Sequence, residues 1–137
     1  MLSNLIYVSK RKSNCTEEEI KKILDSCERN NSGEDITGVL LYSKDSFVQY
    51  LEGEYKKIFE LYDKIKLDDR HKEIRLINSS PIKEKVFPSW HMGAKKLDFS
   101  NIEFKTDITE KDKGEFNKIL NGENSPNSVE LLKKVFN

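Results

Sequence analysis

The stretch ITGVLLYSKDSFVQYL, residues 36–51, contains two apolar runs separated by four polar residues. Both runs are rich in the β-branched and aromatic residues that favour strands. The connection Ser43-Lys44-Asp45-Ser46 has the length and polarity of a short turn. We therefore expect a β-hairpin of residues 36–42 and 47–51 at the centre of the fold.

The segments around this hairpin predict further strands over residues 2–9, 74–82 and 87–93 and helices over residues 17–30 and 55–68. Thr16 and Glu19 have the spacing of a capping box, which favours a helix start at that point. Pro81 and Pro88 restrict the last two strands to edges, ends or bulges. The order βαββαββ predicts an α+β, ferredoxin-like fold, a mixed sheet with both helices on one face.

The chain becomes more polar after Leu97 and then contains two short amphipathic segments, residues 110–120 and 128–136. We interpret residues 1–97 as the body of the fold and residues 98–137 as a helical extension packed on the same domain. The apolar residues of these two helices need a surface to cover. The open face of the sheet is the surface expected to receive them.

Composition limits the function classes. A chain of 137 residues fits one domain with a single core. Its 24 basic residues balance 24 acidic ones, so bulk charge does not favour a nucleic-acid or membrane partner. The two cysteines, Cys15 and Cys27, form no C-x-x-C pair and no His cluster, so no metal site is expected. With no signal-like or membrane-spanning run, the sequence favours the cytoplasm.

Polar and aromatic side chains stand at several positions where the pattern predicts core, namely Tyr7, Asn30, Asn31, Gln49, Trp90 and Met92. Each has an ordinary structural explanation: a packed tyrosine, a helix-capping asparagine, an edge glutamine, core packing of the last two. Together they could line one cleft between the sheet and the helices. The set holds no carboxylate pair and no Ser-His-Asp group, so acid/base catalysis is poorly supported. Neutral amides and aromatics suit a flat heteroaromatic ligand with amide edges.

The sequence resembles the BLUF family, the sensors of blue light using FAD. The stretches that carry the resemblance are LIYVS (5–9), NN (30–31), ITGVLLY (36–42), FVQYLEG (47–53), DDRH (68–71) and FPSWHMG (87–93). Six separated stretches in the family's order and spacing form a specific signal.

The resemblance implies a noncovalently bound flavin, FAD or FMN, between the two helices. Asn31 would hold the carbonyl and imide edge of the ring, with help from Asn30. Tyr7 would donate an electron and a proton after excitation, and Gln49 would bridge Tyr7 and the ring and then rotate or change tautomer. Trp90 and Met92 would relay the change to the surface. The ribityl-phosphate end would meet Lys64, Arg70 and His71.

This interpretation makes the protein a photoreceptor and not an enzyme, without an attached effector domain. Its output would pass through a partner protein, which the sequence does not identify, or through a change of homo-oligomer. Two alternatives use similar frameworks. An acylphosphatase-like hydrolase needs a glycine-rich anion cradle after the first strand, and residues 10–14 contain no glycine. An RNA-binding sheet needs an aromatic pattern that is missing.

Overall fold

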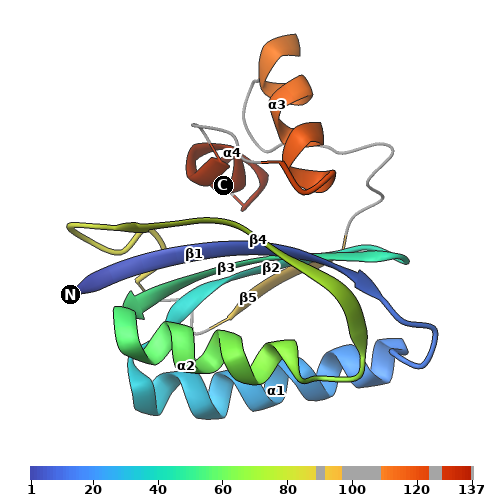
Figure 1. The fold of residues 1–137 in the computed structure, drawn as a ribbon, viewed down its shortest axis with the longest axis vertical. Helices are drawn as coiled ribbons and strands as arrows, with labels where there is room; N and C mark the ends of the chain where they lie inside the picture. The colour runs from blue at the N-terminus through green and yellow to red at the C-terminus, as the bar shows by residue number, and fades with distance from the viewer. Residues whose placement is uncertain (89–91, 97–108, 124–127, 137) are drawn as a thin grey trace.

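The computed structural model of the chain describes residues 1–88, 92–96, 109–123 and 128–136, and for residues 32, 135 and 136 it describes the backbone only. A sheet lies between two layers of helices (Figure 1). The elements in chain order are β1 (Leu2–Arg11), α1 (Glu17–Glu34), β2 (Thr37–Tyr42), β3 (Ser46–Glu54), α2 (Tyr55–Lys66), β4 (His71–Pro81), β5 (Gly93–Lys96), α3 (Glu110–Leu120) and α4 (Ser128–Phe136).

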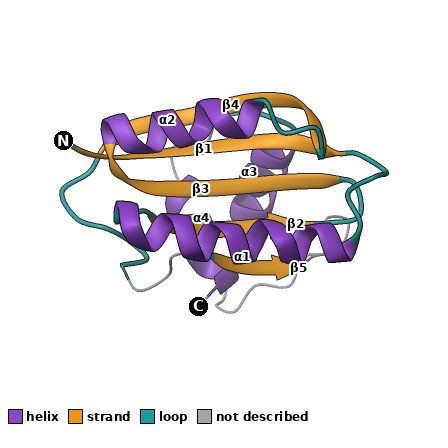
Figure 2. Ribbon diagram, turned by 90° about the horizontal axis from the view of Figure 1, so that it is seen from below, coloured by secondary structure: helices purple, strands orange, loops and turns teal. Residues whose placement is uncertain are grey.

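The sheet has the strand order β4-β1-β3-β2-β5. All neighbouring strands are antiparallel except β2 and β5, which are parallel, so the sheet is mixed. Helices α1 and α2 cover one face, with α2 over β1 and β4, while α3 and α4 lie on the other face (Figures 1 and 2). This arrangement confirms the predicted ferredoxin-like α+β fold.

The predicted hairpin forms from β2 and β3, and its turn is held by one serine. Ser43 Oγ accepts hydrogen bonds from the N–H groups of Asp45 and Ser46 at 3.1 and 3.0 Å. In β2, a Cβ placed on Gly38 would lie 2.0 Å from the carbonyl oxygen of Tyr50. Only glycine therefore allows the two strands to approach this closely.

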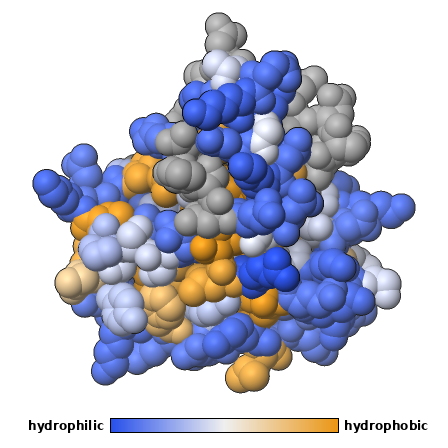
Figure 3. All heavy atoms as spheres, turned by 45° about the horizontal axis from the view of Figure 1, so that its top comes forward, coloured by the Kyte–Doolittle hydropathy of each residue, from blue (hydrophilic) through white to orange (hydrophobic). Residues whose placement is uncertain are grey.

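The C-terminal helices cover the outer face of the sheet, as predicted. Phe116, Ile119, Leu131 and Leu132 are each at most 1 % exposed. They pack on the outward-facing side chains of the strands, Ile6, Val39, Leu41, Val48 and Tyr50, and on Phe87. Figure 3 shows that hydrophilic residues predominate on the surface around α3, while hydrophobic residues gather toward the middle of the same view. The two helices thus complete a second core.

Two predicted boundaries were wrong along α1 and α2. The first helix does not end near Asn30 but continues through Gly33 to Glu34, and Asp35 takes the left-handed conformation with φ 54°. Ile20, Ile23 and Leu24 pack α1 against Leu40 and Phe47 of the sheet, and the buried Asn31 lies in the last turns of this longer helix. Helix α2 ends at Lys66, two residues before the predicted end.

The last strand was predicted too early. Strand β5 spans Gly93–Lys96, and Phe87 and Pro88 lie in the connection before it. The backbone N–H of Phe87 is bound by a side chain, the Glu52 carboxylate at 2.7 Å, and proline has no N–H to give to a ladder. The predicted edge position of Pro81 is confirmed, since it ends β4 at the border of the sheet.

Candidate functional site

Tyr7 and Gln49 face each other across neighbouring strands in the centre of the sheet. The register of β1 and β3 places them directly opposite, and both side chains point toward α1 and α2. They are 4 % and 3 % exposed. The Tyr7 hydroxyl donates a hydrogen bond to Gln49 Oε1 at 2.5 Å. This pair is the buried polar centre of the helix-covered face.

The other end of the Gln49 amide contacts a sulfur atom. Gln49 Nε2 donates to Met92 Sδ at 3.4 Å, and Met92 is half-buried just before β5. The amide therefore lies between a phenol on its oxygen side and a thioether on its nitrogen side. Trp90 lies outside the described residues, so of the two predicted relay residues Met92 is the one found at the glutamine.

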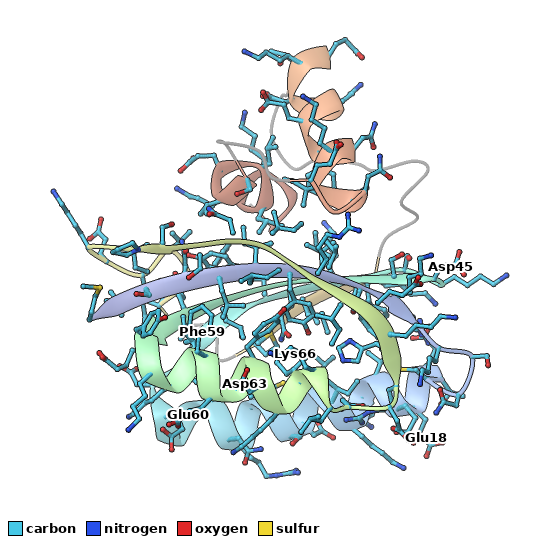
Figure 4. All side chains as sticks on the ribbon, viewed as in Figure 1. Glu18, Asp45, Phe59, Glu60, Asp63 and Lys66 are labelled. Atoms are coloured by element: carbon cyan, nitrogen blue, oxygen red, sulfur yellow. The ribbon has the colours of Figure 1, made fainter. Side chains whose placement is uncertain are left out.

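A cavity opens beside this pair, between the sheet and the two helices. It has a volume of about 70 Å³ and opens to solvent on one side. Its walls are formed by Tyr7, Ile23, Cys27, Leu40, Phe47, Gln49, Leu61, Ile65, Asp68, Arg70 and His71. Figure 4 shows Phe59 of α2 directed toward the sheet and Glu60 directed away from it, so the cavity side of this helix is apolar.

Two ionisable groups of the inner wall, Tyr7 and Cys27, are uncharged at neutral pH. Burial raises the pKa of the Tyr7 phenol far above its ordinary value of 10.0, and the nearby Cys27 adds to this shift. Burial also raises the pKa of the Cys27 thiol to about 11. Both groups therefore keep their protons, so the wall presents neither a phenolate nor a thiolate to a bound molecule.

Charged groups stand at the rim. Arg70 Nε donates to Asp68 Oδ1 at 2.9 Å, and Arg70 Nη1 lies 3.5 Å from Glu19 Oε2. The hydrogen bonds from Arg70 hold the pKa of the Asp68 carboxyl below its usual range. Asp68 and Arg70 border both this cavity and an adjoining open hollow. Lys64, on α2, is exposed and is not among the residues that line either space.

His71 is a buried member of the wall rather than a rim cation. Its Nδ1 lies 2.8 Å from Ser9 Oγ, and its Nε2 lies 2.7 Å from the Ile65 carbonyl oxygen. Because a carbonyl oxygen can only accept, Nε2 carries the proton. The ring also meets Tyr7 edge-on, with 6.2 Å between centroids. His71 thus fixes the distance between β1 and the end of α2 beside Tyr7.

The two asparagines of α1 differ sharply in burial. Asn31 is 1 % exposed, and its carbonyl oxygen accepts from Ile36 and from the cap residue Asp35. Asn30 is exposed and donates from Nδ2 to Ser26 Oγ at 3.2 Å. The described cavity wall reaches Cys27, one turn before Asn31, and does not include Asn31 itself.

Sequence reasoning missed Cys27, Asp68 and Ser9 as parts of this site. Cys27 had been assigned to the ordinary apolar stripe of the helix, yet it stands four residues before Asn31 on the same stripe and so faces the same space. Ser9 follows Leu5 and Tyr7 at strand spacing, so its polar side chain on a buried face was the available signal. Helical and strand phase could therefore have found both.

Other site types receive no support. Within the described residues no group of three metal-ligating side chains comes together. None of the helices in the described part is long and apolar enough to cross a membrane. Arg11, the last residue of β1, is 7 % exposed at its side chain and donates to the carbonyl oxygens of Cys15 and Ser43. It holds two loops together, which disfavours the hydrolase alternative.

Comparisons with known proteins agree with this geometry. Residues 2–93 match the BLUF family, described as "Sensors of blue-light using FAD". The photoactivated adenylate cyclase subunit beta of Euglena gracilis is 33 % identical over 88 residues, which are 64 % of this chain and 10 % of that protein. The chain thus spans about a tenth of the length of that relative.

Two solved structures extend the comparison. The dark-state structure of BlrB, a BLUF protein, is 34 % identical with a TM-score of 0.68, and the match covers 69 % of this chain and 72 % of BlrB. The ground-state structure of BlsA is 26 % identical with a TM-score of 0.76, and covers 98 % of this chain and 87 % of BlsA. On the family match and this likeness, the chain belongs to the BLUF family of flavin-binding blue-light sensors.

Proposed function

We propose that this chain binds FAD noncovalently in the cavity between the sheet and helices α1 and α2, and that light rearranges the hydrogen bonds of Gln49. The observation that carries the proposal is the Tyr7–Gln49–Met92 chain of contacts, with Tyr7 Oη 2.5 Å from Gln49 Oε1 and Gln49 Nε2 3.4 Å from Met92 Sδ. This chain borders the cavity through Tyr7 and Gln49.

The described residues fit a flavin. The inner wall offers apolar surface with a neutral phenol, amide and thiol, which suits a flat ring with polar edges. Asn31 would hold the ring edge, with Asn30 beside it. Arg70, Lys64 and His71 would serve the ribityl-phosphate end. Arg70 borders the cavity and the exposed Lys64 lies on α2, so an anion could reach both, while His71 would act from the wall.

A bound flavin would absorb blue light and act, once excited, as a strong oxidant. Tyr7 is the phenol positioned to lose an electron, and its Oη proton has Gln49 Oε1 as the nearest acceptor. A Gln49 side chain that received this proton at Oε1 and released one from Nε2 toward the bound ring would be the other neutral tautomer, and its Oε1 would then donate instead of accept, so the side chain could rotate. Met92 then loses its hydrogen-bond donor, and the change reaches β5.

Purification in dim light tests the proposal. The protein should be yellow, and denaturation should release intact FAD, which chromatography separates from FMN. Blue light should cause a small reversible red shift of the flavin absorption. A colourless protein that takes up neither FAD nor FMN would refute it.

The downstream output belongs to the same proposal. We propose that the sensor signals in the cytoplasm through a partner protein or a change of homo-oligomer. The two thiols, Cys15 buried and Cys27 half-buried, are both free, which suits a reducing compartment. Light-dependent gel filtration would detect the oligomer change.

A further inference from the structure

Glu52 of β3 is a charged residue buried on the side of the sheet opposite the cavity. Its exposed fraction is 0 %. Each carboxylate oxygen accepts two hydrogen bonds: Oε1 from the Tyr50 hydroxyl at 2.9 Å and from the Val86 N–H at 2.7 Å, and Oε2 from the Thr37 hydroxyl at 2.9 Å and from the Phe87 N–H at 2.7 Å.

Four donors compensate for the burial of this carboxylate. Among the described residues Glu52 has no salt-bridge partner, so hydrogen bonds replace a counter-charge. Two of the four come from consecutive backbone amides in the connection between β4 and β5. Hydrogen bonds to a charged acceptor are stronger than neutral ones, so Glu52 fixes this backbone firmly to β3.

The preceding residue, Lys85, ties the same connection to α1. Its side chain is 12 % exposed, and Nζ donates to the Asp35 carbonyl oxygen at 2.7 Å and to Asp35 Oδ1 at 3.0 Å. Asp35 is the left-handed cap of α1, and its N–H bonds to the Asn31 carbonyl. Lys85 therefore contacts the turn of α1 that carries Asn31.

Phe87, two residues after Lys85, connects this segment to the C-terminal helices. Phe87 is 4 % exposed and packs in the outer-face core with Phe116 of α3 and Leu131 of α4. Its ring meets that of Tyr50 edge-on, with 5.9 Å between centroids. Three consecutive residues, 85–87, thus contact the cavity-side helix, the sheet and the outer-face core in turn.

We propose that Glu52 is a positioning residue of the light switch. Glu52 holds residues 85–87, here called the strut, in place between α1 and the core under α3 and α4. The proposal rests on the proposed function, because it requires that light moves the Asn31 end of α1. A shift of that helix end moves Asp35 and Lys85, and the adjoining amides of Val86 and Phe87 then lose alignment with Glu52. Phe87 carries the displacement to α3 and α4.

The connection is better suited to this movement than the sheet. The strands are held by continuous ladders of hydrogen bonds, whereas the backbone N–H groups of residues 86 and 87 both bind the Glu52 side chain. A two-state element of this kind is what coupling between distant sites requires. Loss of two bonds at one carboxylate changes the position of Phe87 without unfolding the sheet.

Amide hydrogen exchange followed by NMR tests the proposal on the full chain loaded with FAD. In the unaltered protein the amides of Val86 and Phe87 should exchange slowly in the dark and faster in blue light, together with amides of α3. In Glu52→Gln the NH₂ group replaces one acceptor oxygen and faces N–H donors. Dark exchange should then rise about tenfold or more at the one of residues 86 and 87 whose N–H faces the NH₂ group. The red shift should remain, and the light response of α3 should disappear.

Matched variants separate this role from simple stabilisation. Thr37→Val removes one donor from Glu52 but none from the strut, so the light response of α3 should persist. Lys85→Met cuts the link to α1 and should abolish the response of α3 while dark protection at residues 86 and 87 remains. Lys83 is an exposed lysine of the same connection. Lys83→Met should change neither the light response of α3 nor the dark exchange at residues 86 and 87.

A light response of α3 that survives in Glu52→Gln would overturn the proposal. If that variant does not fold, a surviving response in Lys85→Met would overturn it equally. If the proposed function itself is wrong, the unaltered protein shows no red shift in blue light. The dark exchange of Glu52→Gln still reports whether Glu52 holds residues 86 and 87. Unchanged dark exchange in Glu52→Gln would show that Glu52 does not hold the backbone of residues 86 and 87.

Discussion

The Tyr7 hydroxyl donates its hydrogen bond to Oε1 of Gln49 at 2.5 Å, and this contact determines how the amide is turned. Because a phenol donor requires an oxygen acceptor, Nε2 of Gln49 is left to face Met92. One side chain thus connects a redox-active phenol with the beginning of β5.

Tyr7→Phe should abolish the light response and leave the fold intact. Phenylalanine keeps the ring and its packing, and the lost hydrogen bond is worth roughly 0.5–1.5 kcal/mol net. That loss is too small to unfold the domain or to expel the flavin. Phenylalanine has no dissociable proton and is harder to oxidise, so the excited flavin loses its donor. Steady-state difference spectra measure the outcome, and a reversible red shift in this variant would remove Tyr7 from the mechanism.

Asn31→Ala and Asn30→Ala form a matched pair on adjacent residues. Asn31 is 1 % exposed, whereas Asn30 is exposed and bonds Ser26. We expect Asn31→Ala to weaken FAD binding about tenfold or more, because a hydrogen-bonding group next to the ligand is lost. Asn30→Ala should change binding by less than about threefold. Fluorescence titration of FAD gives both values, and equal losses would show that Asn30 holds the cofactor as strongly as Asn31.

Met92→Leu should retain the red shift and slow the return to the dark state. Leucine keeps the approximate volume of methionine but cannot accept the hydrogen bond from Gln49 Nε2. A weak bond of this type contributes roughly 0.5 kcal/mol, so recovery should slow by about two- to threefold. The decay of the red-shifted absorption in darkness measures the rate. Recovery at the unaltered rate would mean that the thioether does not stabilise the dark arrangement of Gln49.

Truncation after Leu97 should lower solubility or change the oligomeric state while the flavin spectrum stays nearly the same. Removal of α3 and α4 uncovers Ile6, Val48 and Tyr50, each at most 1 % exposed in the whole chain. Such a patch favours self-association. Light scattering and gel filtration report the change. A soluble truncated protein with the original assembly state would show that these helices are not needed as a cover.

High pH should destabilise the fold through its buried tyrosines. Burial raises the pKa values of Tyr7, Tyr50 and Tyr62 above the ordinary 10.0. The unfolded chain releases these protons near pH 10, before the folded chain does. The stability is therefore complete below about pH 10 and decreases as the pH rises toward the folded pKa values. Urea unfolding between pH 8 and 11.5 measures this, with Tyr7→Phe expected to show a shallower decline. Stability that stays constant to pH 11.5 would contradict the buried, protonated tyrosines.

The sequence by itself determined the order of elements and the polar positions on the core face. The two apolar runs in residues 36–51, the helical spacing in α1 and α2, and the two C-terminal amphipathic segments are local patterns that each segment carries by itself. Tyr7 and Gln49 were recognisable because strand phase places them among apolar neighbours. The same reasoning predicted that the C-terminal helices cover the outer face of the sheet.

Only the tertiary structure decided which groups pair and where two elements end. Helix α1 continues through Gly33 to Glu34, and Phe87 leaves the strand because Glu52 binds its N–H. Met92 reaches Gln49, and His71 turns inward to Ser9, through contacts between residues distant in the chain. A partner of this kind depends on strand register and burial together, and local periodicity contains neither.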